Sequence, residues 1–424
     1  MQAMVRFGLG ARPGEAPPAD PRGWLAGQIA APDPTVLDPA PTAANGLSVL
    51  RSDRDNKGDG SERRARPLFR AEAAALLENA LTTPAPFRER LVWFWANHFT
   101  VSVRRPVCAA VAGAFVEEAI RPHVTGRFAD MLLAVMRHPA MLLYLDNVAS
   151  VGPDSPAGQR GRRGLNENLA RECLELHTLS PAAGYTQADV TSFAKVLTGW
   201  SINLKDDPPG FVFRAGAHEP GEKTILGRGF PPGQAGGEAA LAFLAGHPAT
   251  HRFLATKLVR HFVADDPAPD DVRAIEAVLR DTGGDLGAAA LALVDLPRAW
   301  QPGGKLRTPQ EFVLAALRGL DLPADRRPAL LGAVGGLGQP AFAAPAPNGW
   351  PDRAADWAAP EAMIRRIDWT YALAGRAAWV DPMQAAEAAL GPLLRAETLD
   401  AVRHAGSRRE ALTLLFASPE FQRR

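Results

Sequence analysis

The chain has 424 residues, long enough to bury one large core or two to three smaller ones, with 46% hydrophobic and 22% charged residues in globular proportions. Its 47 lysines and arginines nearly balance 46 aspartates and glutamates, so the formal charge is +1. That balance excludes a generally basic nucleic-acid-binding protein and offers no overall field to attract acidic substrates.

Residues 1–66 are predicted to hold one N-terminal helix and a loop. Asp20 is a suitable N-cap and Pro21 suits the first helical turn, so a helix is expected at 21–30. Residues 51–66 are rich in Asp, Arg, Gly and Ser and contain almost no apolar side chains. That composition is typical of a mobile surface loop.

Helical periodicity dominates residues 67–202, the predicted helical core half. Thr186 and Asp189 form a capping-box pattern, with Asp in place of the usual Glu, and this pattern marks the start of one helix. The helices predicted in this half are Leu91–Phe99, Phe128–Met136, Leu165–Leu179 and Gln187–Trp200.

A β-hairpin insertion is predicted at residues 203–235, where Phe211–Arg214 and Thr224–Leu226 are short alternating runs on either side of a polar tip. Residues 236–424 are predicted to form a second helical half packed on the first. Its clearest helices are expected at Thr250–Ala264, Asp270–Asp281, Pro309–Gly319, Pro360–Ala378 and Arg408–Ala417. The sequence therefore predicts a mostly α, multi-helical globular protein with one small β-hairpin.

The two cysteines, Cys108 and Cys173, are too few for a disulfide framework, and both lie in helical patterns as small buried hydrophobes. The first 18 residues contain charged side chains and no uninterrupted apolar stretch, so no signal peptide is expected. No run of 18 apolar residues predicts a membrane span. The expected location is the cytoplasm.

The most polar helical segment is 165–179, LNENLARECLELHTL. At 100° per residue its apolar arc consists of Leu165, Leu169, Cys173 and Leu176. Glu167, Arg171 and Glu175 lie on the opposite face at four-residue spacing, a pattern typical of a solvated ladder of salt bridges.

Asn166 and His177 lie at the edge of that apolar arc, close to one another around the helix. A polar group turned toward the core must find hydrogen-bond partners or it destabilises the fold by about 1–3 kcal/mol. Both residues are therefore either satisfied core groups or members of a cleft-lining cluster in which His177 acts as a base or ligand.

His98 raises the same question beside Trp93 and Trp95. An aromatic stripe at this spacing normally lies in the core, but Trp and His side chains together can also line a sugar-sized cleft. His218 is expected on the exposed tip of the hairpin, where it is either an ordinary loop residue or part of a recognition or catalytic site.

Long motifs of this chain resemble those of the bacterial family known as domain of unknown function 1800 (DUF1800), nearly from end to end. The matching stretches include WFWANHFTVS at Trp93–Ser102, NENLARECLELHTLS at Asn166–Ser180, HEPGEKTILG at His218–Gly227, HPATHRFLATKLVRHFV at His247–Val263 and PNGWPD at Pro347–Asp352. The resemblance implies a helical protein of unassigned activity. It also implies that the hairpin and the loop 348–352 approach the first helical half, since both match family motifs yet lack the apolar content of a core.

Members of that family are often exported and often encoded beside a second family that resembles sulfatases and phosphatases. The chain departs from this pattern because it shows no export signal. The resemblance therefore implies that the product of such a neighbouring gene is a partner of this protein. Within the polar segment, the family's motif matches at Asn166, Glu167, Asn168, Arg171, Glu172, Glu175 and His177.

The first functional hypothesis is a hydrolase or transferase that acts on a polar polymer such as a glycan. Glu172 or His177 serves as the general base, and Arg171 or Lys223 balances developing negative charge. In a metal-dependent version the His and Glu side chains are ligands, and the sequence leaves the cofactor open. The expected catalytic residues are His98, Arg171, Glu172, His177 and His218, and the expected substrate-binding residues are Trp95, Asn166, Lys223, Asn348 and Trp350.

The alternative hypothesis is a non-catalytic assembly or chaperone-like protein. Its polar motifs are then structural, its Trp-rich loops dock a partner, and a large exposed apolar patch with a polar rim favours it. Nucleic-acid binding is a third class, but its support is only Arg160, Arg162, Arg163 and the cluster 63–66, which lie in Gly-rich loops without interleaved aromatic residues.

Overall fold

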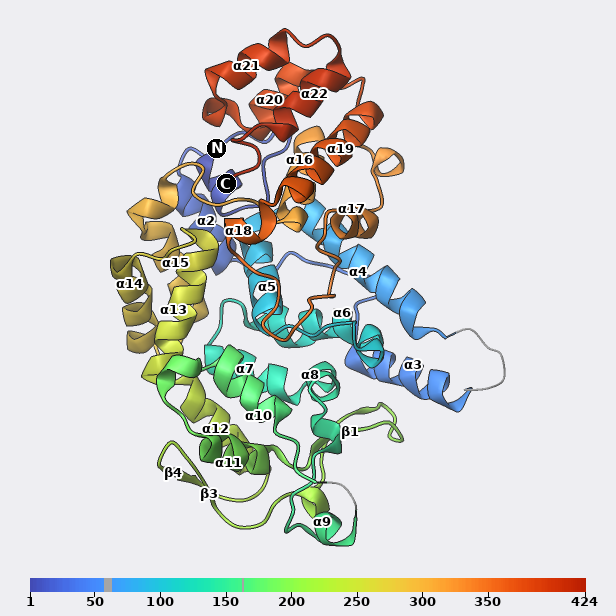
Figure 1. Ribbon diagram of the computed structural model, residues 1–424, viewed down its shortest axis with the longest axis vertical. Coiled ribbons are helices and arrows are strands. Elements are labelled where there is room, and N and C mark those ends of the chain that lie inside the picture. Colours follow the sequence, from blue (N-terminus) through green and yellow to red (C-terminus); the bar gives the residue numbers. More distant parts are fainter. Residues whose placement is uncertain (57–62, 162–163) are drawn as a thin grey trace.

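The computed structural model describes residues 1–56, 63–161 and 164–424 of the chain. The protein is 61% helical, and the described residues form 22 α-helices and two small antiparallel sheets of two strands each (Figure 1). The prediction of a mostly α protein is therefore confirmed. Within the described ranges no helix is both long and apolar enough to cross a membrane.

The N-terminal region holds more helices than the one predicted, because two additional helices, at Gln2–Arg6 and Ala43–Asp55, form besides the expected one. Asp20 caps the second helix as expected, since its carboxylate accepts a hydrogen bond from the backbone N–H of Gly23 at 3.0 Å. The second additional helix, capped by Thr42 and buried through Leu47, extends to Asp55 into the segment predicted as a loop. Residues 57–62 of that segment lie outside the described ranges. The helices are α1 Gln2–Arg6, α2 Pro21–Ala30, α3 Ala43–Asp55, α4 Ala65–Thr82 and α5 Pro86–His98.

The middle of the chain contains short helices, and two stretches, Phe115–Ile120 and Cys173–His177, have π-helical geometry. The capping box at Thr186 and Asp189 is confirmed, with the Asp189 carboxylate accepting from the backbone of Thr186 at 2.8 Å. The helices are α6 Ala112–Ala114, α7 Phe128–Arg137, α8 Pro139–Tyr144, α9 Pro156–Arg160, α10 Asn168–Glu172 and α11 Gln187–Leu197.

The predicted hairpin is wrong in its pairing. Strand β1 (Trp200–Asn203) pairs with β2 (Gly210–Phe213), and β3 (Lys223–Ile225) pairs with β4 (Arg228–Phe230), both antiparallel. The first sheet forms because α11 ends at Leu197, so that Trp200 begins a strand instead of ending a helix. The second closes through Leu226 and Gly227, both with positive φ, as a two-residue hairpin turn demands.

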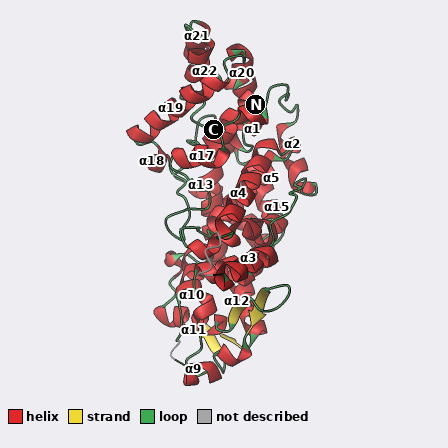
Figure 2. Ribbon diagram, turned by 90° about the vertical axis from the view of Figure 1, so that its right-hand side faces the viewer, coloured by secondary structure: helices red, strands yellow, loops and turns green. Residues whose placement is uncertain are grey.

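The helices after the sheets are α12 Gln234–Ala245, α13 Pro248–Phe262, α14 Pro269–Asp281, α15 Leu286–Asp295, α16 Pro309–Leu320, α17 Leu330–Gly336, α18 Ala354–Trp357, α19 Pro360–Arg376, α20 Pro382–Ala389, α21 Ala396–Arg403 and α22 Arg408–Ala417. Five of them, α13, α14, α16, α19 and α22, agree closely with the predicted ranges, and the others have no predicted range. Figure 2 shows the strands toward one end of the molecule and helices α19–α22 at the other.

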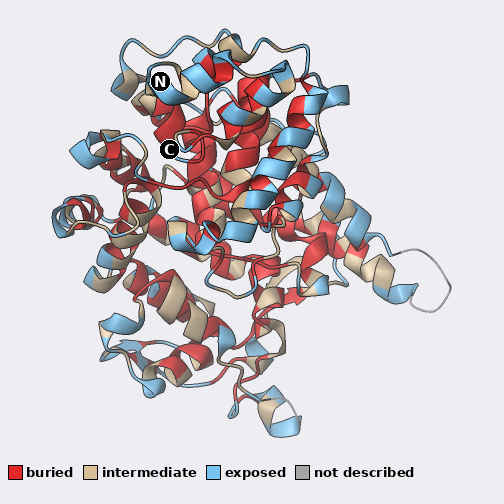
Figure 3. Ribbon diagram, turned by 45° about the horizontal axis from the view of Figure 1, so that its top comes forward, coloured by how far each residue is buried: buried red, intermediate tan, exposed pale blue. Residues whose placement is uncertain are grey.

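Two large hydrophobic clusters form the interior (Figure 3). The larger includes side chains of α2, α5, α7, α10–α15 and both sheets, among them the buried Cys108 and Cys173. The smaller includes side chains of α4, α16, α17 and α19–α22. Trp93 of α5 and Phe342 pack against both clusters, so the carboxyl-terminal half of α5 lies where the two cores meet.

The capping box of α11 gives a test of the local fold. Replacing Thr186 by Ala removes the hydroxyl that accepts from the backbone N–H of Asp189, and we expect the free energy of unfolding to fall by about 1 kcal/mol. Urea unfolding measures the change. Thr256→Ala is the control, because within the described ranges the Thr256 hydroxyl bonds only to the Arg252 carbonyl of its own helix. Equal stability of the Thr186 variant and wild type would contradict the assigned cap.

Candidate functional site

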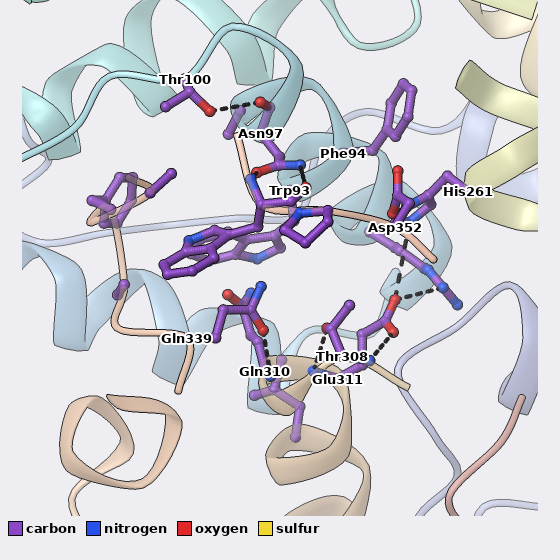
Figure 4. A pocket seen from close by; sticks show the side chains of 18 of the residues that line it. Trp93, Phe94, Asn97, Thr100, His261, Thr308, Gln310, Glu311, Gln339 and Asp352 are labelled. Atoms are coloured by element: carbon purple, nitrogen blue, oxygen red, sulfur yellow. Dashed lines mark hydrogen bonds and ion pairs between the residues drawn. The ribbon is translucent and has the colours of Figure 1, made fainter. Parts of the chain in front are cut away.

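A pocket opens where the two cores meet, between α5, the end of α13, the start of α16 and the segment 339–352. Its empty space, including the open mouth and the solvent in front of it, is about 830 Å³. Figure 4 shows His261, Asp352 and Glu311 gathered at one end of this pocket, with Trp93 across its middle.

His261 and Asp352 form a hydrogen-bonded pair at that end of the pocket. The Nδ1 atom of His261 donates to Oδ1 of Asp352 at 2.7 Å, which leaves Nε2 as the unprotonated nitrogen of the neutral ring. Burial lowers the pKa of His261 below its ordinary value. The positive charges of Arg424 and Arg90 lower it further, whereas Asp352 acts in the opposite direction. The ring is therefore neutral at pH 7, and its Nε2 can accept a proton.

The pKa of Asp352 is also lowered. Burial alone would raise it, but the hydrogen bond from His261 and the charges of Lys305 and Arg424 outweigh burial and favour the carboxylate. The Lys305 ammonium also donates to the backbone carbonyl of Asp352, which fixes the end of the loop. Asp352 is thus an ionised, oriented partner for His261.

Glu311 lies on the other side of His261, with its Oε1 atom 3.9 Å from Nε2. Its carboxylate accepts from Arg90 at 2.6 Å, from Arg424 at 3.1 Å and from the backbone N–H of Thr308 at 2.9 Å. Burial raises the pKa of Glu311, but Arg424 and Arg90 lower it far more, so the group stays ionised. Glu311 is therefore a structural anion and the N3 residue of the α16 capping box.

The loop that carries Asp352 is fixed to the end of α5. The side-chain amide of Asn97 donates to the backbone carbonyl of Trp350 at 2.9 Å, and its Oδ1 atom accepts from the backbone N–H of Trp350 at 2.7 Å. A Cβ atom on Gly349 (φ +79°) would lie 2.4 Å from the Asn97 carbonyl oxygen, so this approach requires glycine. These contacts confirm that the loop approaches the first helical half.

Aromatic and amide side chains form the rest of the pocket. Trp93 and Trp350 both line it, and the Nε1–H of Trp93 is buried without a hydrogen-bond partner in the described residues. Gln339 accepts from the backbone N–H of Gln310 at 2.9 Å, and both glutamine side chains line the pocket (Figure 4). Indole faces with nearby amides are groups that bind polar, ring-shaped molecules.

His98 and His177 meet as predicted, but in the core. The Nε2–H of His98 donates to the backbone carbonyl of His177 at 3.1 Å, and the ring centroids are 6.1 Å apart. Nδ1 of His98 and both ring nitrogens of His177 are buried without partners in the described part of the chain. Trp95 packs against His98, Phe99 and Phe128 at 1% exposure, so its predicted role in substrate binding is wrong.

The opposite orientations of Trp93 and Trp95 follow from helical geometry. Residues two apart on an α-helix point about 200° apart, so when Trp93 faces the pocket Trp95 faces the core.

The helix predicted at 165–179 begins only at Asn168. Asn166 lies before it, where its side chain accepts from the Asn168 N–H at 2.9 Å. The chain then becomes π-helical from Cys173 to His177, and this i→i+5 bonding shifts the side chains that follow. Leu174 is buried and Leu176 only partly buried, so the predicted apolar arc and the nearness of Asn166 to His177 are wrong beyond Cys173.

The charged side chains of segment 165–179 are arranged as in a surface ladder of salt bridges. Arg171 donates to Glu167 and to Gln187, each at 2.9 Å, and its side chain is 40% exposed. Glu172 is half-buried, and burial together with Glu175 raises its pKa. Neither residue lines the pocket described above.

His218 is buried, so its predicted exposure on a hairpin tip is wrong. Its Nδ1–H donates to the Thr198 carbonyl at 2.8 Å, and its Nε2 accepts from the Gly233 N–H at 2.8 Å. Lys223 is buried as well and donates to the backbone carbonyl of Glu219. The HEPGEK motif therefore fixes the sheets to α11, which also confirms that this insertion approaches the first half.

Of the ten predicted site residues, Trp350 lines the pocket, while Asn348 is exposed on the loop beside it. The sequence reasoning missed Asn97, His261, Glu311 and Asp352. Asn97, His261 and Asp352 lie within quoted family motifs, and that was the available signal. In the described residues no group of three or more His, Cys, Asp or Glu side chains is placed to hold a metal ion, so the predicted His and Glu ligands do not form a metal site.

The sequence model of one protein family, described as "Protein of unknown function (DUF1800)", matches residues 2–423 of the chain. The chain therefore belongs to this family, and the resemblance seen in its motifs is confirmed. No curated protein and no solved structure matches the chain.

The buried His177 predicts a pH dependence of stability. Burial, and secondly the charge of Lys257, lower the pKa of His177 from 6.5 to about 3. Below pH 6.5 the unfolded chain binds a proton that the folded protein does not, so stability falls as the pH falls toward 3. This residue alone contributes a slope of about 1.4 kcal/mol per pH unit.

The measurement is urea unfolding at several pH values in that range. His177→Leu should lose this part of the slope, whereas the exposed His404→Leu control should keep the wild-type slope. A His177 variant with an unchanged slope would show that the residue is protonated in the folded protein.

Proposed function

We propose that the protein is a hydrolase or transferase that acts on a polar polymer such as a glycan, and that its catalytic centre is the pocket around His261. The observation that carries the proposal is the 2.7 Å hydrogen bond between His261 and Asp352 at one end of that pocket. A carboxylate-oriented, neutral imidazole is the arrangement used for general-base catalysis.

His261 is the general base. Its Nε2 has no hydrogen-bond partner among the described residues, and the nearest carboxylate, Glu311, is 3.9 Å away. It accepts a proton from a water molecule or a ligand hydroxyl, and Asp352 stabilises the imidazolium that forms. Arg90, which lines the same end, supplies positive charge near the reacting group.

The remaining lining supports a saccharide as the ligand. Sugar rings have an apolar face that stacks on indoles and a rim of hydroxyl groups that bond to amides. Trp93 and Trp350 supply the indoles, and Gln310 and Gln339 supply the amides.

The test is hydrolysis of a panel of p-nitrophenyl glycosides and esters by the purified protein. We expect His261→Gln and Asp352→Asn each to lower the rate by about 10²–10⁴-fold, the usual contribution of a general base. Because the pKa of His261 is lowered, the rate should fall with decreasing pH only below 6.5. His404→Gln, an exposed histidine, is the control.

Two outcomes would contradict the enzyme proposal. One is the absence of turnover across the whole panel. The other is that both pocket variants turn over substrate at a rate within about twofold of the wild-type rate, since a general base contributes far more than that.

A second candidate function, a non-catalytic assembly protein, is favoured by an exposed apolar stripe on α19. Ile364, Ile367 and Tyr371 are 57%, 45% and 46% exposed and share one helical face, with Trp379 at 49% just beyond the helix. Adjacent exposed apolar side chains of this size mark protein-binding surfaces. The proposed partner is the product of a neighbouring sulfatase- or phosphatase-like gene.

Affinity purification of the tagged chain from its native host tests this candidate. The neighbouring gene product should be recovered with wild type and lost with Ile364→Asp, because a carboxylate on the stripe opposes an apolar contact. Val36→Asp, at an 86% exposed site outside the stripe, is the control. Equal recovery with all three proteins, or no recovery of that product even after crosslinking, would rule the surface out.

A further inference from the structure

An unusual excess of buried positive charge lies behind the His261 end of the pocket. We define the buried cation cluster as Arg6, Arg90, Lys305, Arg307, Arg366 and Arg424, each at most 2% exposed. Its members are connected: Arg6 donates to the Arg424 carbonyl at 2.9 Å, and Arg366 donates to the Arg307 carbonyl at 2.8 Å.

The carboxylates near the cluster do not balance it. Glu311 pairs with Arg90 and Arg424, Asp265 pairs with Lys305, and Asp352 pairs with His261. Arg6, Arg307 and Arg366 have no side-chain carboxylate partner in the described residues and bond to main-chain oxygens and one amide. Six cationic side chains therefore face three side-chain carboxylates, so the side chains leave a local excess of positive charge.

Such an excess is costly in a low-dielectric interior and needs a compensating anion. The guanidinium atoms Nε of Arg90, Nη2 of Arg307 and Nη1 of Arg424 are buried without partners in the described part of the chain. Burial and the neighbouring charge of Arg424 lower the pKa of Arg6 and of Arg307 to about 9. Of Arg90, Arg307 and Arg424 only Arg90 lines the pocket, so it is through Arg90 that the excess charge can meet an anionic ligand.

We propose that the pocket binds a saccharide that carries an acidic group, with that group at the His261 and Arg90 end. The inference rests on the proposed saccharide-binding function and names its substrate class. The cluster reaches the pocket through Arg90, which lines it, while the carboxylates at the same end lie beside other members of the cluster, Glu311 beside Arg424 and Asp352 beside Lys305 and Arg424. Its positive potential therefore favours an anion there.

The neutral overall charge does not oppose this inference. The formal charge of +1 describes the whole chain, whereas folding brings six cations from positions 6 to 424 to one place. The field that matters to a bound ligand is the local one, because more distant charges on the surface are screened by salt.

Fluorescence titration with three oligosaccharides tests the proposal, since Trp93 and Trp350 line the pocket and report on binding. The probes are a galacturonate trimer, a sulfated galactose trimer and a neutral galactose trimer. At least one acidic trimer should bind about tenfold more tightly than the neutral one, and only the acidic binding should weaken in high salt. The two acidic arms distinguish a carboxylate from a sulfate ester.

Arg307→Met removes one unpaired charge of the cluster and should reduce the preference for the acidic trimer several-fold while leaving neutral binding unchanged. Arg318→Met is the matched control, because Arg318 is equally buried and bonds to the carbonyls of Gly10 and Leu81 but neither lines the pocket nor belongs to the cluster. Arg366→Met is a second variant in case Arg307→Met fails to fold.

The outcomes separate this inference from the proposed function. Equal affinity for acidic and neutral trimers overturns the acidic preference and leaves saccharide binding standing. Binding of none of the three overturns both proposals. A preference that Arg318→Met weakens as much as Arg307→Met overturns the role of the cluster.

Discussion

The carboxylate of Glu311 is the constraint on which the rest of the structure depends. It caps α16 at Thr308, pairs with Arg90 of α5 and pairs with Arg424 at the far end of the sequence. Burial alone would favour the neutral acid, but the charges of Arg424 and Arg90 outweigh burial and keep this carboxylate ionised. One side chain thus joins the two cores at the place where the pocket opens, and it sets the electrostatics around His261.

The candidate site results from the meeting of the two cores. Helix α5 contributes Trp93 to one side of the boundary and Trp95 to the other, so a single helix both completes a core and lines a pocket. The loop ending at Asp352 then closes against α5 through Asn97. Rigid helices on both sides hold the His261–Asp352 pair, the property that a catalytic or binding site requires.

Polar motifs in this protein serve two different purposes. His218 has a partner for each ring nitrogen, and His98 and His177 lie deep in the larger core, so these residues stabilise or constrain the fold. His261, in contrast, keeps one nitrogen without a partner in the described residues at the edge of a pocket. Long motifs in a sequence therefore do not distinguish a structural histidine from a reactive one; the hydrogen-bond partners do.

The sequence by itself determined the helical class, long helices such as α13, α14 and α16, the capping box at Thr186 and the family, because these depend on local periodicity, local hydrogen bonds and residue order. It also indicated Trp350 and the approach of its loop. Only the tertiary structure decided the strand pairing, the π-helical shift before His177 and the joining of His261 to Asp352, which are 91 residues apart. These features depend on which distant groups become neighbours, and neither spacing nor composition carries that information.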